Sequence, residues 1–253
     1  MKKSILLLFL AILVVMIYIT SNAGEKDNEL TVYAGAGLKA PLEEIAEKFN
    51  EKEGIKVEYN FAGCGQHLSQ MENTEECDVF IAGSSDFAKI AIDKGYINSY
   101  QDLVKHIPAI ATSKNLELDS IEELFSSKYI MAQGDEKATA IGKVAKKIYM
   151  NLGREEIKNS VKDLIVSPTA NQLLIYIENG NADFAIVWED MTINDERFNT
   201  YDIPKESNLI KEVPIAITKF SDSPEISNKF LNYIKSEEGY KVFEKHGFKK
   251  CKE

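Results

Sequence analysis

The hydrophobic pattern of the chain alternates between short apolar runs and longer amphipathic stretches. The segment LTVYAGAG (residues 30–37) begins like a buried strand and ends in a turn of small residues. The next segment, LKAPLEEIAEKFNEKEG (residues 38–54), has the periodicity of a helix. Its shared apolar face consists of Leu38, Leu42, Ile45, Ala46 and Phe49. A strand, a bare turn and a helix in this order predict an α/β fold.

The same unit recurs along most of the chain. It is repeated in residues 55–74, 77–97, 129–153 and 163–180, and a further buried strand and two closing helices follow in residues 182–190 and 223–248. Strands such as DVFIAGS have a continuous apolar centre, which indicates that both faces of a sheet are covered. We therefore predict mainly parallel sheets with helices on both faces.

Two similar apolar segments, KHIPAIAT (residues 105–112) and KEVPIAIT (residues 211–218), are the candidates for connecting two lobes. No Pro- or Gly-rich linker divides the sequence, so extended strands would have to make these connections. On this basis lobe one is predicted to comprise residues 30–109 plus 213–253, and lobe two residues 110–212.

The first 23 residues have the pattern of a targeting segment. Two lysines precede an apolar run over residues 5–19, and the small residues Ser21-Asn22-Ala23 follow. This pattern predicts a secretory signal peptide. The run is shorter than a typical membrane span, but an uncleaved N-terminal anchor stays open as an alternative. Either way the protein is predicted to act outside the cytoplasm, in the periplasm or on the outer face of the cytoplasmic membrane.

Charge and cysteine content narrow the classes of partner. The net charge is −10 at pH 7, which argues against nucleic acid, because phosphate binding needs clustered Lys and Arg. An anionic ligand would have to be held by local dipoles. The three cysteines, Cys64, Cys77 and Cys251, are expected to be reduced thiols, since a Cys64–Cys77 bridge would have to span a whole short helix.

Four predicted strand-to-helix turns carry only small or uncharged side chains. In parallel α/β sheets, ligands lie at the carboxyl ends of strands, where helix N-termini offer free N–H groups. Small residues let this backbone approach a ligand closely. The sequence therefore predicts a cage of backbone N–H donors for an anion. The four turns are Gly35-Ala36-Gly37, Gly63-Cys64-Gly65, Ala138-Thr139-Ala140 and Pro168-Thr169-Ala170-Asn171.

Other interpretations of these residues are open at this stage. Glycine turns are common for purely structural reasons, although two Gly-x-Gly turns at matching points favour binding. Cys64 and His67 could form a thiolate–base pair or half of a metal site, but a small buried cysteine beside a surface histidine is the preferred interpretation. Trp188, the only tryptophan, suits a core role and a ligand-wall role equally.

From Leu30 to Phe248 the chain resembles the molybdate-binding proteins of ABC importers, within the two-lobed solute-binding proteins. The resemblance is carried by the order and spacing of LTVYAGAGLKAPLEEIAEKFNEKEGIKVEYNFAGCGQHLSQM, DVFIAGSSDFAKIAIDKGYI, GDEKATAIGKVAKKI, DFAIVWED and NYIKSEEGYKVFEKHGF. It implies a periplasmic-binding-protein type II-like fold with a ligand cleft between the lobes. It also implies capture of an oxyanion by neutral hydrogen bonds and delivery to a membrane permease.

The resemblance also implies where the ligand lies. A family serine after the first strand corresponds to Gly37 beside Ala36, a second serine to the Cys64-Gly65 turn, and a family tyrosine to Trp188. Both serine hydroxyls and the tyrosine hydroxyl are therefore missing, whereas backbone N–H groups and an indole N–H remain. The implied ligand-binding residues are Ala36, Gly37, Cys64, Gly65, Thr139, Ala140, Asn171 and Trp188.

Replacement groups could come from nearby side chains. Asn171, Thr139 and Gln66 could supply donors, whereas Glu189 and Asp135 could accept hydrogen bonds or coordinate a metal. An acceptor would matter for a protonated anion, whereas a fully ionised dianion must meet donors only.

The resulting prediction is a monomeric extracytoplasmic solute-binding protein for a tetrahedral oxyanion, molybdate or tungstate first. It is predicted to have no cofactor, no metal site of its own and no enzymatic activity. Three rival functions are retained. The same fold could bind sulfate, phosphate or a small carboxylate. The protein could be a Cys64- or metal-dependent enzyme, or a membrane-anchored sensor.

Overall fold

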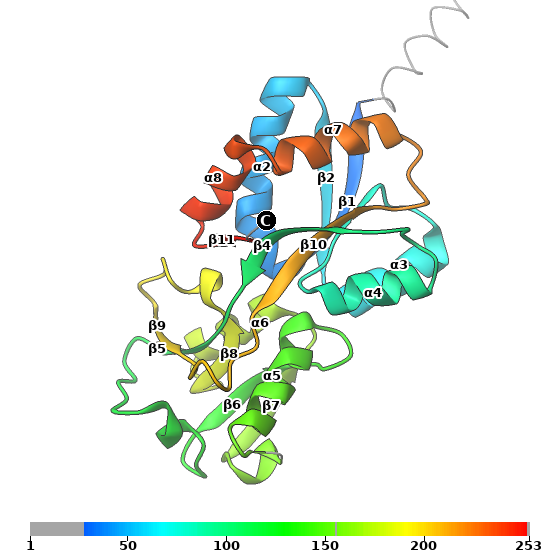
Figure 1. The fold of residues 1–253 in the computed structure, drawn as a ribbon. Coiled ribbons are helices and arrows are strands. Elements are labelled where there is room, and N and C mark those ends of the chain that lie inside the picture. The colour runs from blue at the N-terminus through cyan, green and yellow to red at the C-terminus, as the bar shows by residue number, and fades with distance from the viewer. Residues whose placement is uncertain (1–27, 155, 252–253) are drawn as a thin grey trace, which may run out of the picture.

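The computed structural model describes residues 28–154 and 156–251 and contains two β-sheets, each flanked by helices (Figure 1). The part of the chain built on the six-stranded sheet is called lobe one, and the part built on the five-stranded sheet lobe two. The predicted signal peptide or anchor in residues 1–23 lies outside the described residues.

Lobe one combines the N-terminal part of the chain with its C-terminal part. Its sheet has the strand order β11-β4-β10-β3-β1-β2. The strands are β1 (Glu29–Gly35), β2 (Lys56–Ala62), β3 (Val79–Ile81), β4 (Gln101–His106), β10 (Lys211–Ile217) and β11 (Lys249–Lys250). The helices are η1 (Ala36–Leu38), α2 (Lys39–Glu53), α3 (Cys64–Thr74), α4 (Ser85–Asp93), α7 (Pro224–Ile234) and α8 (Glu237–Lys245).

Lobe two is formed by the continuous middle of the chain. Its sheet has the order β7-β6-β8-β5-β9. The strands are β5 (Pro108–Ser113), β6 (Ile130–Gly134), β7 (Asp163–Ser167), β8 (Phe184–Trp188) and β9 (Phe198–Asp202). The helices are η2 (Ile121–Leu124), α5 (Ala140–Asn151), η3 (Ile157–Asn159), α6 (Ala170–Glu178) and η4 (Glu189–Met191).

The chain crosses between the lobes twice. The first crossing is short, because only Ile107 separates β4 in one sheet from β5 in the other. The second runs from the end of β9 through residues 203–210 to β10. Both changes of sheet occur just before the boundaries that the sequence predicts after Ala109 and Glu212.

Each sheet is mixed, so the prediction of mainly parallel sheets holds only for part of each lobe. In lobe one β1 is parallel to β2 and β3, and in lobe two β6 is parallel to β7 and β8. The strands next to the crossings, β4, β5 and β10, pair antiparallel with their neighbours. Alternating β-α units give the parallel strands, whereas a chain that returns from the other lobe enters its sheet in the opposite direction.

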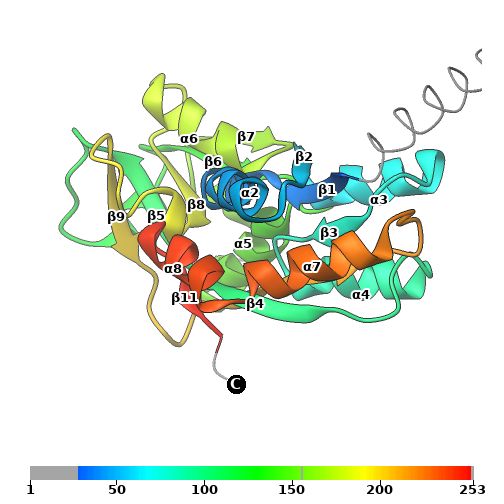
Figure 2. The same cartoon turned by 90° about the horizontal axis from the view of Figure 1, so that it is seen from above.

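Side chains of β1 alternate between two helical layers, as strand geometry requires. Leu30, Val32 and Ala34 belong to the core that lies under α2, α7 and α8. Tyr33 faces the opposite side, where it packs in the core with α3 and α4. Viewed from above, these two groups of helices flank the sheet of lobe one (Figure 2). Both faces of the sheet are therefore buried, which explains the uninterrupted apolar character of its central strands.

The buried face and the C-terminal cap of α2 show why the sequence forms this helix. Leu42, Ile45 and Phe49 are completely buried, and their spacing places them on one face. The helix ends at Gly54, which has a φ of 69° and donates its N–H to the carbonyl oxygen of Asn50. Glycine adopts this left-handed conformation without the steric cost that a side chain imposes.

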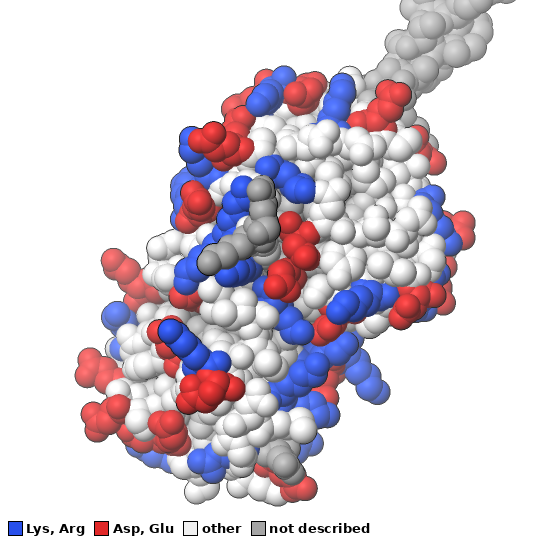
Figure 3. Space-filling model, viewed as in Figure 1, with Lys and Arg blue, Asp and Glu red and all other residues white. Residues whose placement is uncertain are grey.

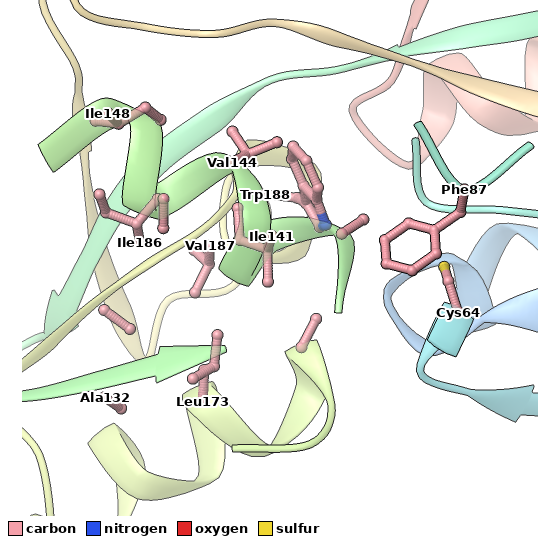
Figure 4. Close-up of a cluster of buried hydrophobic side chains, with 14 of the residues drawn as sticks. Cys64, Phe87, Ala132, Ile141, Val144, Ile148, Leu173, Ile186, Val187 and Trp188 are labelled. Carbon is pink, nitrogen blue, oxygen red and sulfur yellow. The ribbon is translucent and has the colours of Figure 1, made fainter. Parts of the chain in front are cut away.

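The larger apolar core is continuous across the two lobes. It contains Cys64 and Phe87 from lobe one together with Ile141, Val144 and Trp188 from lobe two. Figure 4 shows these side chains on opposite sides of the space between the lobes. The lobes are thus in direct contact in this structure, close to the ends of β1, β2, β6 and β8.

Charged side chains of both signs cover the face shown in Figure 3. Basic side chains gather where α4 and α5 face each other, with Lys143, Lys147 and Lys211 around Asp86. Within the described part of the chain, no helix has the length and apolar character needed to cross a membrane.

Candidate functional site

A small cavity lies between the lobes where the bare turns converge. Its volume is about 20 Å³, counted as the space open to the centre of a water-sized sphere. The described residues around it include no Lys, Arg, Asp or Glu. The lining residues are Gly35, Ala36, Gly37, Leu38, Ala62, Gly63, Cys64, Gly83, His106, Thr139, Ala140, Ile141, Ala170 and Trp188.

Lobe one contributes the turn after β1. Gly37 lies in the short helix η1, and its φ is not positive, so backbone conformation does not require glycine there. A Cβ at this position would lie 3.4 Å from both Cδ1 of Trp188 and Sδ of Met191. A single Cβ would therefore just reach van der Waals contact with the wall of the opposite lobe.

Lobe one also contributes the start of α3. Gln66 and His67 donate their N–H groups to the carbonyl oxygen of Gly63, and Gly65 donates to Ala138 of lobe two at 3.1 Å. The N–H of Cys64, the first residue of the helix, has no acceptor within the helix and lies at the cavity.

Lobe two contributes the starts of α5 and α6. Thr139 caps α5, because its Oγ1 accepts the N–H of Gly142 at 3.0 Å. Thr169 caps α6 in the same way through the N–H of Gln172. The first N–H groups of each helix remain without an intrahelical acceptor, and Ala140, Ile141 and Ala170 line the cavity. Three helix N-termini from two lobes therefore meet at one point.

Trp188 closes the cavity from the end of β8. It is 2% exposed, and its indole Nε1 makes no hydrogen bond to any described residue. Figure 4 shows this nitrogen on the side of the ring that is nearer to Cys64 and Phe87. Trp188 packs in the core and also lines the cavity.

Six of the eight predicted site residues line the cavity: Ala36, Gly37, Cys64, Thr139, Ala140 and Trp188. Gly65 and Asn171 do not. They join the lobes instead, through the Gly65–Ala138 hydrogen bond and a hydrogen bond of 2.9 Å from Nδ2 of Asn171 to the carbonyl oxygen of Ala36.

The other side chains proposed as replacement donors or acceptors also have partners elsewhere. Gln66 accepts the N–H of Gly63, and Thr139 donates to the carbonyl oxygen of Asp135. The carboxylate of Asp135 accepts two N–H groups of its own turn, and Glu189 lies 3.4 Å from Nζ of Lys249. In this structure the cavity therefore offers backbone donors and the indole N–H rather than these side chains.

Apart from Trp188, the lining residues that lie outside the four predicted turns and their immediate neighbours are Gly83 and His106. Gly83 follows β3 in the segment IAGSS, which is another turn of small residues after a strand, so the same rule would have found it. His106 ends β4 and reaches the cavity only because the chain crosses between lobes there. No local sequence pattern marks that position.

The surroundings of Cys64 and His67 do not favour thiolate chemistry. Burial raises the pKa of the Cys64 thiol to about 11, even though the N–H of Gly83 donates to Sγ at 3.3 Å. His67 is completely buried and packs against aromatic rings, so the expected surface position is wrong. Among the residues that the structure describes, no group of three or more His, Cys, Asp or Glu could hold a metal ion.

His67 gives the fold a predictable acid sensitivity. Burial lowers the pKa of its imidazole to about 4, and the nearby backbone of Asn60 opposes this only in part. Above pH 6.5 the imidazole is neutral in both folded and unfolded states. Between pH 6.5 and 4 the unfolded state binds the proton first, so stability falls with pH, by on the order of 2 kcal/mol.

The variant His67→Phe is expected to lose this part of the acid sensitivity, because a phenyl ring can pack against Tyr33 and Phe80 without a charge to bury. Urea unfolding at about pH 7 and about pH 4.5 measures the free energy of unfolding of both proteins. An equal loss of stability in wild type and variant would refute the assignment.

Comparison with known proteins agrees with this arrangement. Residues 30–249 match the family described as "Bacterial extracellular solute-binding protein". A putative binding protein of Haemophilus influenzae is 31% identical over 223 residues, covering 87% of this chain and 90% of the relative. A putative ABC transporter substrate-binding lipoprotein of Bacillus subtilis, YvgL, is 28% identical over 258 residues and covers 98% of both chains.

Two further similar proteins have molybdate in their names. The molybdate-binding protein ModA of Escherichia coli is 23% identical over 240 residues, covering 91% of this chain and 92% of the relative. The structure of a periplasmic molybdate-binding protein of Azotobacter vinelandii matches with a TM-score of 0.79 at 15% identity, covering 88% of this chain and 100% of that one. At that identity the structural match establishes the two-lobed fold.

The family is one of binding proteins that act outside the cytoplasm, and not one of enzymes. Its match covers both sheets and all four bare turns of this chain. The chain therefore belongs to the family of bacterial extracellular solute-binding proteins.

Proposed function

We propose that this solute-binding protein captures a tetrahedral oxyanion, molybdate or tungstate first, in the cavity between its lobes. The observation that carries the proposal is the convergence of three helix N-termini on a cavity without Lys, Arg, Asp or Glu. Helix N-termini supply N–H donors and partial positive charge, which together suit an anion. The name of the relative in Escherichia coli supports molybdate as the first candidate.

The size of the cavity supports a compact ion. Its volume is that of a sphere with a radius of about 1.7 Å for the centres of oxygen-sized atoms. Four oxygens bonded to one central atom occupy a space of this kind, whereas a ligand with an organic group would need the lobes to separate further. A fully ionised oxyanion also avoids placing a hydroxyl donor against a wall of donors.

The proposal includes the path of the ligand. The anion would bind between separated lobes, and closure would form the interlobe contacts of Gly65 and Asn171. The monomeric protein would then deliver the anion to the membrane permease of an ABC importer, from the periplasm or the outer face of the cytoplasmic membrane. The name of the relative in Bacillus subtilis supports an ABC transporter, and residues 5–19 are the proposed signal or anchor.

Thermal unfolding of the purified protein with molybdate, tungstate, sulfate, phosphate or chromate tests this proposal. A ligand at about 100 times its dissociation constant adds about 2.7 kcal/mol to the folded state. For a chain of this size the Tm should rise by roughly 5–10 °C. We expect the increase with molybdate and tungstate.

The other anions serve as controls for charge and shape. A shift with sulfate or phosphate alone would replace molybdate with that anion as the ligand. No shift with any of the five would contradict oxyanion capture, and small carboxylates would be screened next.

A further inference from the structure

Among the described residues that line the cavity, His106 has the one ionisable side chain apart from the thiol of Cys64. It is 1% exposed, and its ring stacks on the indole of Trp188 with centroids 3.8 Å apart and planes inclined by 11°. The ring belongs to lobe one and the indole to lobe two. His106 therefore lies against the cavity and between the lobes at the same time.

An oxygen acceptor lies near each ring nitrogen of His106. Nδ1 lies 3.0 Å from the carbonyl oxygen of Gly83, which can only accept, so Nδ1 must carry a proton. Nε2 lies 3.4 Å from Oδ1 of Asp190, whose side chain is 5% exposed, and it has no hydrogen-bond partner. A neutral ring would therefore turn the lone pair of Nε2 toward a buried carboxylate. Only the imidazolium presents donors to both acceptors.

If His106 is an imidazolium paired with Asp190, the positive end of the pair lies at the cavity. His106 lines the cavity, whereas Asp190 lines a separate recess beside the start of α2. Because His106, Trp188 and Asp190 are all buried, water screens the charge weakly and its field extends into the cavity. The imidazolium can act on a bound anion without a hydrogen bond to it.

We propose that His106, held as an imidazolium by Gly83 and Asp190, is a specificity-determining residue that makes the cavity prefer dianions to monoanions. The proposal rests on the proposed capture of a tetrahedral oxyanion. Backbone donors recognise the shape and acceptor character of such an ion, but they discriminate weakly by its net charge. A fixed positive charge adds attraction in proportion to the charge of the ligand.

Tungstate and perrhenate provide the test, because both are tetrahedral ions of similar size with charges of −2 and −1. Fluorescence of Trp188, the only tryptophan in the chain, can report binding of each ion at one pH. Wild type is expected to bind tungstate at least about tenfold more tightly than perrhenate. In His106→Gln the ratio of the two affinities should fall by about tenfold, mainly through weaker tungstate binding.

Two further variants separate charge from packing. His106→Phe keeps an aromatic ring against Trp188 but removes the charge, so the affinity ratio should fall as in His106→Gln. Phe248→Leu alters packing at the ring that lies 5.6 Å from the His106 ring, removes no charge, and should leave the ratio unchanged. Calorimetry can replace fluorescence wherever a substitution alters the emission of Trp188.

The outcomes distinguish this proposal from the proposed function. If wild type binds both ions and the histidine variants lose equal affinity for each, His106 has only a structural role and the charge proposal is overturned. If wild type binds neither ion nor molybdate, oxyanion capture itself fails and the role of His106 fails with it.

Discussion

A methyl group at position 65 is expected to hold the lobes apart and to weaken oxyanion binding by at least about 100-fold. In Gly65→Ala the new Cβ would lie 2.5 Å from the carbonyl oxygen of Lys137 and 3.1 Å from Cα of Ala138. Both are backbone atoms of the turn before α5. The carboxylate of Asp135 accepts the N–H groups of Lys137 and Ala138 at 2.7 and 2.8 Å, so this turn cannot easily move away.

The φ of Gly65 is not positive, so alanine fits the backbone of α3 and lobe one should fold normally. Calorimetry with molybdate measures the affinity, and circular dichroism with thermal unfolding measures the fold. Ser69→Ala, one turn further along α3 and exposed, is the matched control and should bind like wild type. Wild-type affinity in Gly65→Ala would show that the observed interlobe contact is not part of the bound state.

A valine at position 37 is expected to abolish detectable oxyanion binding, with a loss of at least about 1,000-fold. The Cβ itself would just contact Trp188 and Met191 at 3.4 Å, but the two further methyl groups would extend into the cavity. A cavity of about 20 Å³ leaves no room for both these groups and an anion.

Gly37→Ala is the matched control, because its single Cβ reaches only ordinary van der Waals distance. It should keep binding within about tenfold of wild type. Both variants should keep the circular dichroism spectrum and the unliganded Tm, since the φ of Gly37 is not positive and the change faces the cavity. A Gly37→Val protein that binds molybdate normally would remove the turn after β1 from the site.

The four bare turns are the part of the candidate site that the sequence predicts. The local sequence pattern predicts them. A strand, then one or two residues with small side chains, then the start of a helix together predict an exposed helix N-terminus. Because the carboxyl ends of β1, β2, β6 and β7 point to the space between the lobes, three of these starts meet at one cavity. Gly83, in the turn of small residues after β3, obeys the same rule.

The remaining features depend on the contact between lobes. Asn171 has the side chain of a ligand donor, yet its amide reaches Ala36 of the other lobe. His106 reaches the cavity because β4 and β5 are separated by a single residue. Neither outcome is encoded in a local pattern, since each depends on how far two separately folded units approach each other.

The placement of β10 also constrains the order in which the chain can fold. This strand pairs with β3 and β4 in the sheet of lobe one, but it follows the whole of lobe two in the sequence. During export, all residues of the five-stranded sheet emerge before β10, α7 and α8. Lobe two can thus complete its hydrogen-bonded sheet from contiguous chain, whereas lobe one must wait for long-range pairing with its last segment.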